Sequence, residues 1–479
     1  MKSLSNKNVG VWTVRGSVTV AALVVAAAFM TPWDVSAQST GESLNDNQLS
    51  MDAAVRKVCP RLRALVATNS ATQEEKDLFV RCNRVINASG GVDSQSPALQ
   101  ALTAEEANAA GTNVVEIGSA SRSNVAGRLA TLRNAGAGAT TASLQQPGQL
   151  VFSTTGGASG DDGSFSEGRL GLFVQGAFGS GDKDPTRNEA GYDVDTFSVT
   201  GGIDYRFTDS LVAGAALGYA QTDSDFTRDS SGTRIGGSFD TDSLTLSLYG
   251  SWYGERSYVD LVASYGDIDY DSERRIVYSV SATPGQVGDV VLPATDSVNS
   301  TAHGKTSGDT LEVGLGAGVN FGNGPWRFGP LFAVNYLDLG VDGFSETGAD
   351  ELNLRYGDQS GESLQLQLGV DVAYTASLSR GVLVPYGSFV WISEQKDDQE
   401  SFRLRYVSDP CARDGSGVTE CSNFDVSSDK PDGNFYRWSV GLSAVFANGL
   451  AAFVDYTSIA SLETISYGEA TIGLRYQFR

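Results

Sequence analysis

Histidine is nearly absent from this sequence, and other residues that carry chemistry are scarce. The 479 residues include one histidine, four cysteines and three methionines. Histidine is the commonest general base near neutral pH and a frequent metal ligand, so its scarcity argues against His-based catalysis and His-rich metal sites. The sequence also has no G-x-S-x-G nucleophile motif, no G-x-x-x-x-G-K-[ST] phosphate-binding loop and no Cys/His spacing that fits zinc. We therefore expect no enzymatic activity, no catalytic residue, no cofactor and no bound metal.

Basic residues and long apolar runs are also lacking. Lys and Arg total 34 against 57 Asp and Glu, which gives a formal net charge of −23. A nucleic-acid partner requires a basic surface, so we expect no nucleic-acid binding. Beyond the N-terminal segment, no stretch is apolar over the roughly 18 residues that a membrane-spanning helix needs. We therefore expect no transmembrane helix.

The N-terminus has the pattern of a secretory signal peptide. Basic residues near the start precede a mostly apolar stretch at 17–30, and the small residues of "VSA" at 35–37 fit a signal-peptidase site. The apolar stretch is too short to span a bilayer. We predict that residues 1–37 are a signal peptide; the alternative is a buried N-terminal helix. Export would place the chain in an oxidising compartment, where its cysteines can form disulfides.

Residues 38–102 are predicted to form a helical hairpin region. "SMDAAVRKVCPRLRALVA" is amphipathic, and we expect Pro60 to kink this helix or to begin a new one. "TQEEKDLFVRCNRVI" opens with capping-box spacing and places its apolar residues on one face. Cys59 lies midway along the first helix, and Cys82 lies on the packing face of the second. We predict a Cys59–Cys82 disulfide between the helices; the alternative is two buried free thiols.

A further helix is predicted over residues 103–134. Thr103 and Glu106 have capping-box spacing, and glycines follow the segment. Its faces carry mostly small residues, so it is poorly suited to building an apolar core. The arginines on its C-terminal half are Arg122, Arg128 and Arg133. Residues 135–167 are rich in Gly, Ser, Thr and Gln and are predicted to be a flexible linker.

Period-2 alternation dominates residues 168–479. In "LEVGLGAGVNF", Leu311, Val313 and Leu315 alternate with a glutamate and glycines, which is typical of a strand with one apolar face. Twelve such runs are present. They lie near 168–179, 192–207, 211–226, 237–253, 257–270, 307–322, 325–338, 353–376, 381–394, 433–447, 449–459 and 464–478.

The connections between these runs favour a membrane barrel. Short turns alternate with mostly longer polar connections, of which the longest, 271–306 and 395–432, are expected to be loops. An even strand count, both ends on the short-turn side and aromatic residues at run ends describe a transmembrane β-barrel. The rival is a soluble β-sandwich or barrel with its apolar face inward. Run lengths above those of soluble sheets, and polar faces rich in Gly, Ser and Gln, favour the membrane barrel. We therefore predict an all-β fold: a 12-stranded antiparallel transmembrane β-barrel preceded by a small α-helical N-terminal region.

Four stretches of the chain resemble the translocator unit of the autotransporter (type V secretion) family. They are "GGIDYRFTDSLVAGAALGYAQTDSDF" (201–226), "VPYGSFVWISEQ" (384–395), "GLSAVFANGLAAFVDY" (441–456) and "IGLRYQF" (472–478). The resemblance spans about 168–478. It implies a monomeric barrel in the Gram-negative outer membrane, with its long loops extracellular. The partners it implies are outer-membrane lipid, the barrel-assembly machinery and periplasmic chaperones.

The resemblance also assigns a role to the last strand. In that family the closing strand carries the assembly signal and ends in an aromatic residue. Ile472, Leu474, Tyr476 and Phe478 form the matching outward row in this chain. The last strand must pair with the first, because an open edge in lipid leaves backbone groups unsatisfied.

The same family threads a helix through the barrel lumen, and residues 103–134 are the candidate here. Its arginines would then meet carboxylates on the inward faces of the strands, because buried charges need partners. The alternative is a helix in the periplasm or outside, with the lumenal charges paired among themselves. The lumenal candidates are Asp204, Arg206, Asp260, Glu312, Arg327, Asp371, Asp455 and Arg475.

The remaining features give a second disulfide prediction and two assignments of residues to solvated positions. Cys411 and Cys421 share the 395–432 loop, and we predict that they form a second disulfide. His303 is interpreted as a solvated loop residue. The acidic stretches "GDKDPTRNEAGYDVDTF" and "TDSDFTRDSSG" offer oxygen ligands without EF-hand spacing, so we interpret them as solvated charge.

Two functions remain open from the sequence. The first is an outer-membrane translocator and anchor that carries a short helical N-terminal segment and no large passenger, since no solenoid repeat precedes the barrel. The second is a passenger-less barrel that acts through its surface loops, as an adhesin or interaction surface, or as a gated pore.

Overall fold

The computed structural model describes residues 44–107, 141–146, 149–153, 169–254, 256–379, 381–396, 399, 401–413, 419–446 and 450–477. Several predictions fall on other parts of the chain. The predicted signal peptide, Arg122, Arg128, Arg133 and Phe478 lie outside the described residues.

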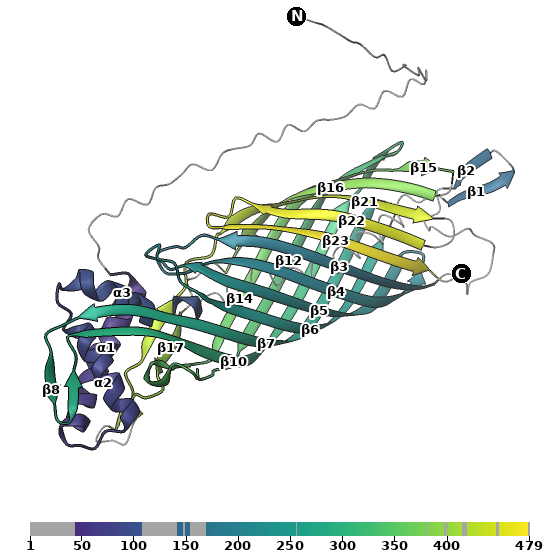
Figure 1. The fold of residues 1–479 in the computed structure, drawn as a ribbon. Helices are drawn as coiled ribbons and strands as arrows, with labels where there is room; N and C mark the ends of the chain where they lie inside the picture. The colour runs from purple at the N-terminus through teal and green to yellow at the C-terminus, as the bar shows by residue number, and fades with distance from the viewer. Residues whose placement is uncertain are drawn as a thin grey trace, which may run out of the picture. The chain divides into compact units, whose positions relative to one another are not determined.

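Twelve long antiparallel strands form a closed barrel, which confirms the predicted fold class (Figure 1). The strands are β3 (Leu170–Lys183), β4 (Gly191–Thr208), β5 (Leu211–Arg228), β6 (Gly237–Tyr253), β7 (Ser257–Ser281), β10 (Thr295–Val319), β12 (Trp326–Val341), β14 (Gln359–Tyr374), β16 (Gly381–Glu394), β21 (Asn434–Phe446), β22 (Leu450–Ala460) and β23 (Ile465–Gln477). The short strands β11 (Phe321–Asn323) and β15 (Ala376–Leu378) extend two of the turns.

The ring is closed by its last and first strands. β23 pairs with β3 along its whole length, and β10 pairs with both β7 and β12. Each long strand therefore has a partner on both sides. Hydrocarbon offers no hydrogen bonds to an open strand edge, so closure satisfies the backbone. The expected pairing of the last strand with the first is confirmed.

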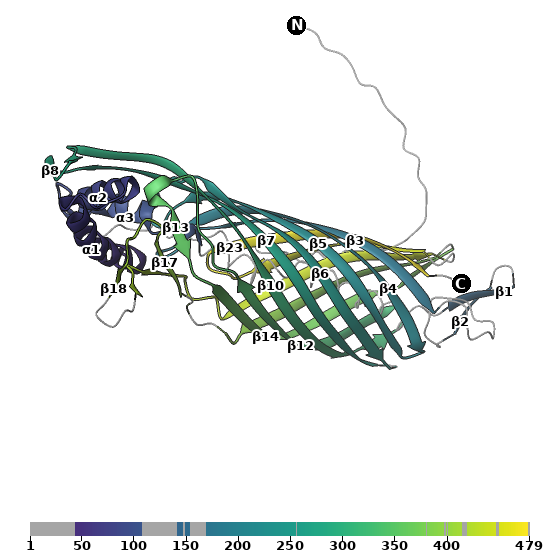
Figure 2. The same cartoon turned by 90° about the horizontal axis from the view of Figure 1, so that it is seen from below.

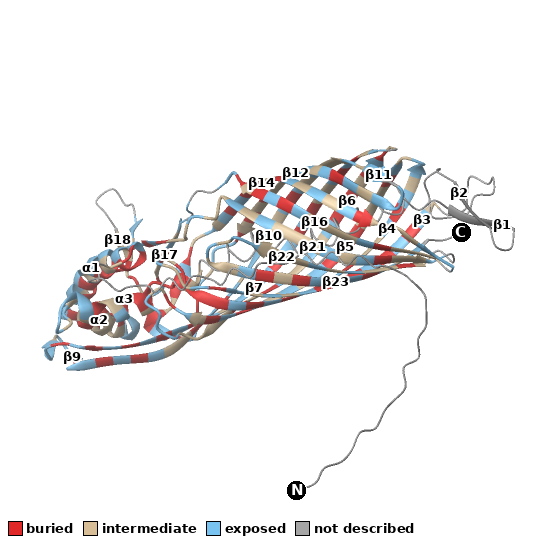
Figure 3. Cartoon of the chain, turned by 90° about the horizontal axis from the view of Figure 1, so that it is seen from above, coloured by how far each residue is buried: buried red, intermediate tan, exposed pale blue. Residues whose placement is uncertain are grey.

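Alternation along each strand decides which side chains face outward. On β6, Leu246 is 55% exposed, whereas the next residue, Ser247, is 4% exposed. On β23, Ile472, Leu474 and Tyr476 form an exposed row. Figure 3 shows the same alternation of buried and exposed positions around the barrel. An apolar outer face and a polar inner face suit lipid outside, and they are the reverse of a soluble barrel.

The two ends of the barrel differ. At the short-turn end lie the turns β4–β5, β6–β7, β10–β12, β14–β16 and β21–β22, with the start of β3 and the end of β23. At the long-loop end lie the connections β3–β4, β5–β6, β7–β10, β12–β14, β16–β21 and β22–β23.

The prediction of a loop at 271–306 is wrong. β7 and β10 each run for 25 residues and continue beyond the barrel as a β-hairpin. The small strands β8 (Gly285–Val287) and β9 (Val290–Leu292) form its tip (Figure 1). The polar composition suggested a loop, but Ile276, Tyr278 and Val280 alternate with exposed residues and are buried. His303 consequently lies on a strand rather than in a loop.

Two other connections contain strands that the sequence did not reveal. The run predicted at 353–376 is divided into β13 (Leu354–Tyr356) and β14. The predicted loop 395–432 contains β17 (Ser401–Tyr406), β18 (Ala412–Arg413), β19 (Thr419–Glu420) and β20 (Phe424–Ser427). β13, β17 and β20 form a separate three-stranded sheet. In the predicted linker, β1 (Thr141–Gln146) pairs with β2 (Gln149–Ser153).

Ahead of the barrel, the described residues form the α-helices α1 (Asp46–Ala67), α2 (Gln73–Ile86) and α3 (Val92–Leu102). Asn45 and Thr72 cap the first two with capping boxes. The predicted Cys59–Cys82 disulfide joins α1 to α2 and is confirmed, with an S–S distance of 2.03 Å. Within the described chain, no helix has the length and apolar character needed to cross a membrane.

Of the two alternatives at Pro60, a kink or a new helix, the second is wrong, because α1 continues through Pro60 with buried Val58 and Leu62 on either side. Thr103 does not begin a helix either, because it follows α3, which the sequence did not reveal. Its Oγ1 donates to the carbonyl oxygen of Gln100 (2.8 Å). Ala104 then takes a left-handed φ of 56°, which ends the helical path before a 3₁₀ turn at Glu105–Ala107.

Candidate functional site: the head and the lumen

The helices pack on the long-loop end of the barrel (Figures 1 and 2). We call residues 44–107 the helical segment, and the helical segment together with the β7–β10 hairpin and the β13–β17–β20 sheet the head. A single apolar core runs through the head. Its buried members from the helical segment include Met51, Leu62, Phe79 and Leu99, and those from the connections include Ile276, Leu354, Leu404 and Val426. Neither part can bury this apolar surface without the other.

An arginine from α2 anchors the helical segment to two connections. Arg81 pairs with Asp296 on β10 and, through Nε, with Glu351 Oε1 at 2.7 Å. Both carboxylates are almost fully buried. Burial lowers the pKa of Arg81, but its hydrogen bond to Glu351 and the charges of Asp296 and Glu351 outweigh burial and raise the pKa. Arg81 therefore stays charged and satisfies two carboxylates that would otherwise be buried without a cation.

A buried carboxyl ties the start and the end of the helical segment to two further connections. Asn45 Nδ2 donates to Glu105 Oε1 (2.9 Å) and to the carbonyl oxygen of Arg187 in the β3–β4 connection (2.8 Å). Ser230 Oγ, in the β5–β6 connection, donates to the same carboxyl at 3.0 Å. Burial raises the pKa of Glu105 to about 8, against hydrogen bonds from Asn45 and Ser230 that lower it. Loops far apart in the sequence thus meet at one carboxyl.

The helical segment leads to the mouth of the barrel. Glu106 and Ala107 line a small cavity together with Phe226, Phe239 and Tyr270. Those aromatic side chains project from β5, β6 and β7 into a buried cluster at the long-loop end. The last described residue of the helical segment therefore lies at the long-loop mouth.

The chain resumes beside the barrel's other end. Arg169 precedes β3, and its carbonyl oxygen accepts a hydrogen bond from the backbone N–H of Arg206 at the short-turn end (2.8 Å). Residues 108–168 therefore have to join the long-loop end to the short-turn end. β3 alone spans roughly 45 Å along its axis.

The predicted lumenal charges fall into two groups. Asp204 is buried beside Arg475, with Arg475 Nη2 at 3.8 Å from Asp204 Oδ1. Arg206 Nη1 donates to the hydroxyl of Tyr253. The second group lines one cavity of about 360 Å³ inside the barrel: Asp260, Glu312, Arg327, Asp371 and Asp455.

The same cavity is lined by polar residues that sequence reasoning did not single out. Gln365 and Gln367 project from β14, and Arg437 Nη2 donates to Gln367 Oε1 at 2.9 Å. They occupy the alternate positions of a strand whose apolar face had been recognised, which is the signal that could have found them. Carboxylates, amides and two arginines give this cavity a polar wall of mixed charge.

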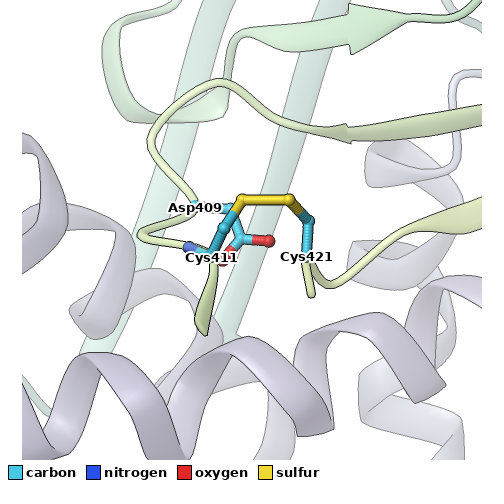
Figure 4. Close-up of side chains that lie close together, drawn as sticks. All are labelled: Asp409, Cys411 and Cys421. Atoms are coloured by element: carbon cyan, nitrogen blue, oxygen red, sulfur yellow. Dashed lines mark hydrogen bonds between the residues drawn. A yellow bond between two sulfur atoms is a disulfide. The ribbon is translucent and has the colours of Figure 1, made fainter. Parts of the chain in front are cut away.

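The second predicted disulfide, Cys411–Cys421, is confirmed and joins the segments β18 and β19 (Figure 4). Asp409 lies beside it and accepts a hydrogen bond from the backbone N–H of Cys411 at 3.1 Å. Within the described residues, this trio is the grouping that could resemble a metal site. Its sulfurs are bonded to each other and offer no thiolate, so the group is structural.

His303 lies on the outer side of the β7–β10 hairpin. Its side chain is 57% exposed, with Nδ1 3.9 Å from Glu273 Oε2. Its backbone pairs with Thr347 in both directions. The residue therefore joins the hairpin to the β12–β14 connection, and its ring is solvated as the sequence had suggested.

Comparisons with known proteins match the barrel. The model of the autotransporter beta-domain family matches residues 172–457. The chain is 25% identical over 293 residues to the putative uncharacterized protein YaiT of Escherichia coli K12, covering 60% of this chain and 25% of YaiT. It is 23% identical over 282 residues to the esterase EstA of Pseudomonas aeruginosa, covering 58% of this chain and 38% of EstA. The chain thus spans well under half the length of these curated relatives.

Solved translocator structures are similar at low identity. The translocator domain of NalP from Neisseria meningitidis is 16% identical with a TM-score of 0.47, covering 65% of this chain and 89% of that one. The transport unit of AIDA-I from Escherichia coli is 13% identical with a TM-score of 0.41, covering 66% and 93%.

Proposed function

Because this chain belongs to the autotransporter beta-domain family and forms an outer-membrane autotransporter barrel, we propose that it translocates its own short helical segment and keeps it bound at the cell surface. In this proposal the long-loop end is extracellular and residues 1–37 direct export as a signal peptide. Periplasmic chaperones would hold the chain before the barrel-assembly machinery inserts it.

One observation carries the proposal. The helical segment packs on the long-loop end, whereas β3 begins at the short-turn end, so residues 108–168 have to connect the two ends. A chain threaded through the barrel makes this connection without crossing lipid, where an unpaired backbone is disfavoured. The position of Ala107 beside the inward aromatics at the long-loop mouth fits such an entry point. The mixed-charge lumen could pair with the arginines at 122, 128 and 133.

We propose a non-catalytic role for the chain. The esterase activity in the name of EstA belongs to that protein, of which this chain spans 38%. The sole histidine is solvated on a hairpin that serves to hold the helical segment. A second candidate function is that the head acts as an adhesin-like interaction surface. This role gains support from the single core that the helices and the long connections share.

Single-cysteine labelling on intact cells tests the proposal, because all four native cysteines are in disulfides. Lys57→Cys reports on exposed α1, Ser297→Cys on the outward face of the hairpin, and Ser377→Cys on the short-turn end. A membrane-impermeant maleimide should label the first two positions and leave Ser377→Cys unlabelled until the membrane is broken. If Ser297→Cys reacts and Lys57→Cys does not, the helical segment has not crossed and the proposal is wrong.

A further inference from the structure

A cluster of arginines lies on the outer face of the three-stranded sheet in the head. Leu404 and Tyr406 of β17 point into the core, so the alternate residues Arg403 and Arg405 face away from it. Arg355 of β13 is the direct cross-strand partner of Arg405. We call Arg355, Arg403 and Arg405 the arginine face.

The arginine face carries more positive charge than its surroundings balance. Arg403 pairs with Asp425 through Nε at 3.4 Å, and both side chains are more than half exposed. Arg405 Nη1 donates to the carbonyl oxygen of Tyr406 (3.3 Å) and lies 3.8 Å from Cys411 Sγ. In the part of the chain that the structure describes, neither Arg405 nor Arg355 forms an ion pair with a carboxylate. Two like charges directly opposed across a ladder are destabilising unless an anion screens them.

The opposite charge gathers on another side of the same molecule. Outward positions of β4 to β7, just beyond the apolar belt, form an acidic rim. Its members are Asp193, Asp195, Asp223, Asp225, Asp240, Asp242, Asp267, Asp269 and Asp271. Several are direct cross-strand partners: Asp195 with Asp223, Asp223 with Asp240, and Asp240 with Asp271. Lys305 pairs with Asp271 at 2.5 Å, but the rim as a whole stays strongly negative.

The two surfaces lie at similar heights on roughly opposite sides of the barrel. The arginine face arises from the β12–β14 and β16–β21 connections, whereas the acidic rim lies on β4 to β7. The outward apolar row of β14 begins at Leu364, and the tilted strand rises roughly 12 Å from there to Gln359, next to β13. On β7, Asp271 lies roughly 15 Å beyond the exposed Tyr265. Two copies standing side by side in one membrane could therefore bring one surface against the other.

We propose that the arginine face of one copy binds the acidic rim of a second copy, so that complete barrels associate side by side in the membrane. Such a contact is heterologous, because different surfaces meet, and it can repeat along a row. It neutralises an excess of each sign and is weakened by salt. A barrel that one chain closes needs no neighbour for its own fold, so this association is additional to the barrel expected from the sequence. The proposal does not require the helical segment to have crossed the membrane.

Cross-linking of isolated outer membranes at low and high salt tests this contact. Wild-type chains should give cross-linked dimers and higher species at low salt and fewer at high salt. The double variant Arg355→Glu/Arg405→Glu should lower the dimer yield about tenfold. The matched control Lys57→Glu/Arg63→Glu makes the same charge change on exposed α1 and should leave the yield unchanged. A heat-modifiable band and an unchanged helical circular dichroism signal at 222 nm in each variant show that the barrel and the helical segment are in place.

Charge exchange gives the decisive comparison. Asp223→Arg/Asp240→Arg should also lower the dimer yield when expressed alone. Co-expression with Arg355→Glu/Arg405→Glu should restore cross-linking between the two variants, because each then offers the surface that the other has lost. An unchanged yield in the arginine variant overturns the proposal. So does unchanged cross-linking with weaker binding to lipopolysaccharide vesicles, which would assign the arginine face to phosphates of the outer leaflet.

Discussion

Replacing Arg81 with alanine should detach the helical segment while leaving the barrel intact. The substitution leaves Asp296 and Glu351 with side chains 3% and 9% exposed and no cation between them. Removing one partner of a buried ion pair destabilises by about 3–5 kcal/mol. The Arg81 side chain is 28% exposed, so water screens part of the effect and we take about 3 kcal/mol as the expected loss. Lys76→Ala is the matched control, because its partner Asp289 is largely in solvent and its loss should fall within experimental scatter.

Circular dichroism at 222 nm during urea unfolding of the purified protein can measure this effect. The signal there reports the helices, whereas the barrel is β-structure. For a segment of this size, with a slope of about 1 kcal/mol per molar urea, the helical midpoint should fall by about 3 M. If the segment is less stable than that, its helices should already be melted without urea. Coinciding midpoints for Arg81→Ala and Lys76→Ala would refute the reasoning. Combining Arg81→Met with Asp296→Asn and Glu351→Gln should recover much of the loss, because no buried charge remains unpaired.

Three further predictions concern other contacts. Replacing Cys59 and Cys82 together with serine should destabilise the head by about 3 kcal/mol, the value for a closed loop of this length, as read from the same 222 nm transition. Burial raises the folded-state pKa of Glu105 to about 8 from a usual value of 4.5. The contribution of Glu105 to head stability should therefore be complete below about pH 4.5 and decline as the pH rises toward 8. Glu105→Gln should flatten this trend in urea midpoints measured between pH 4.5 and 8. Deleting residues 476–479 should abolish the heat-modifiable barrel band, because Tyr476 pairs with β3 and faces lipid. Deleting residues 286–289 at the hairpin tip should leave the band unchanged. A wild-type band after the first deletion would contradict the register of the closing strand.

The barrel could be predicted from the sequence because alternation is a local signal. The alternation around Leu244, Leu246 and Leu248 assigns these residues to one face of a strand without information from distant residues. The β7–β10 extension was missed for the opposite reason. Ile276 and Tyr278 are separated by exposed polar residues in an Asp- and Ser-rich stretch, and their burial depends on helices nearly 200 positions away. Local composition cannot report a partner at that distance.

In the candidate site, too, the locally encoded features could be predicted and the features that depend on distant residues could not. The Cys59–Cys82 disulfide could be predicted from the sequence, because Cys82 lies on the packing face of the second helix, Cys59 lies midway along the first, and the expected export permits disulfides. The anchors of the helical segment could not be identified, since Arg81 differs from other helix-surface arginines only by the carboxylates that the loops supply. Glu105 falls within the helix predicted over residues 103–134, and the left-handed φ of Ala104 beside it has no signature in the sequence. Sites assembled from several loops are invisible until the loops are placed.

The shared core of the head bears on how this chain can be re-engineered or diversified. An exchange of residues 44–107 for another protein domain would uncover Tyr278, Leu404, Tyr406 and Phe424 together, an adhesive apolar patch on the long-loop end. Fusion to the barrel for surface display should therefore keep the helical segment and add the guest ahead of it. For the same reason, we expect core positions of α1 and of the β7–β10 hairpin to change together among related chains. The helical segment and the connections that it packs against should therefore vary together, although about 200 residues of sequence lie between them.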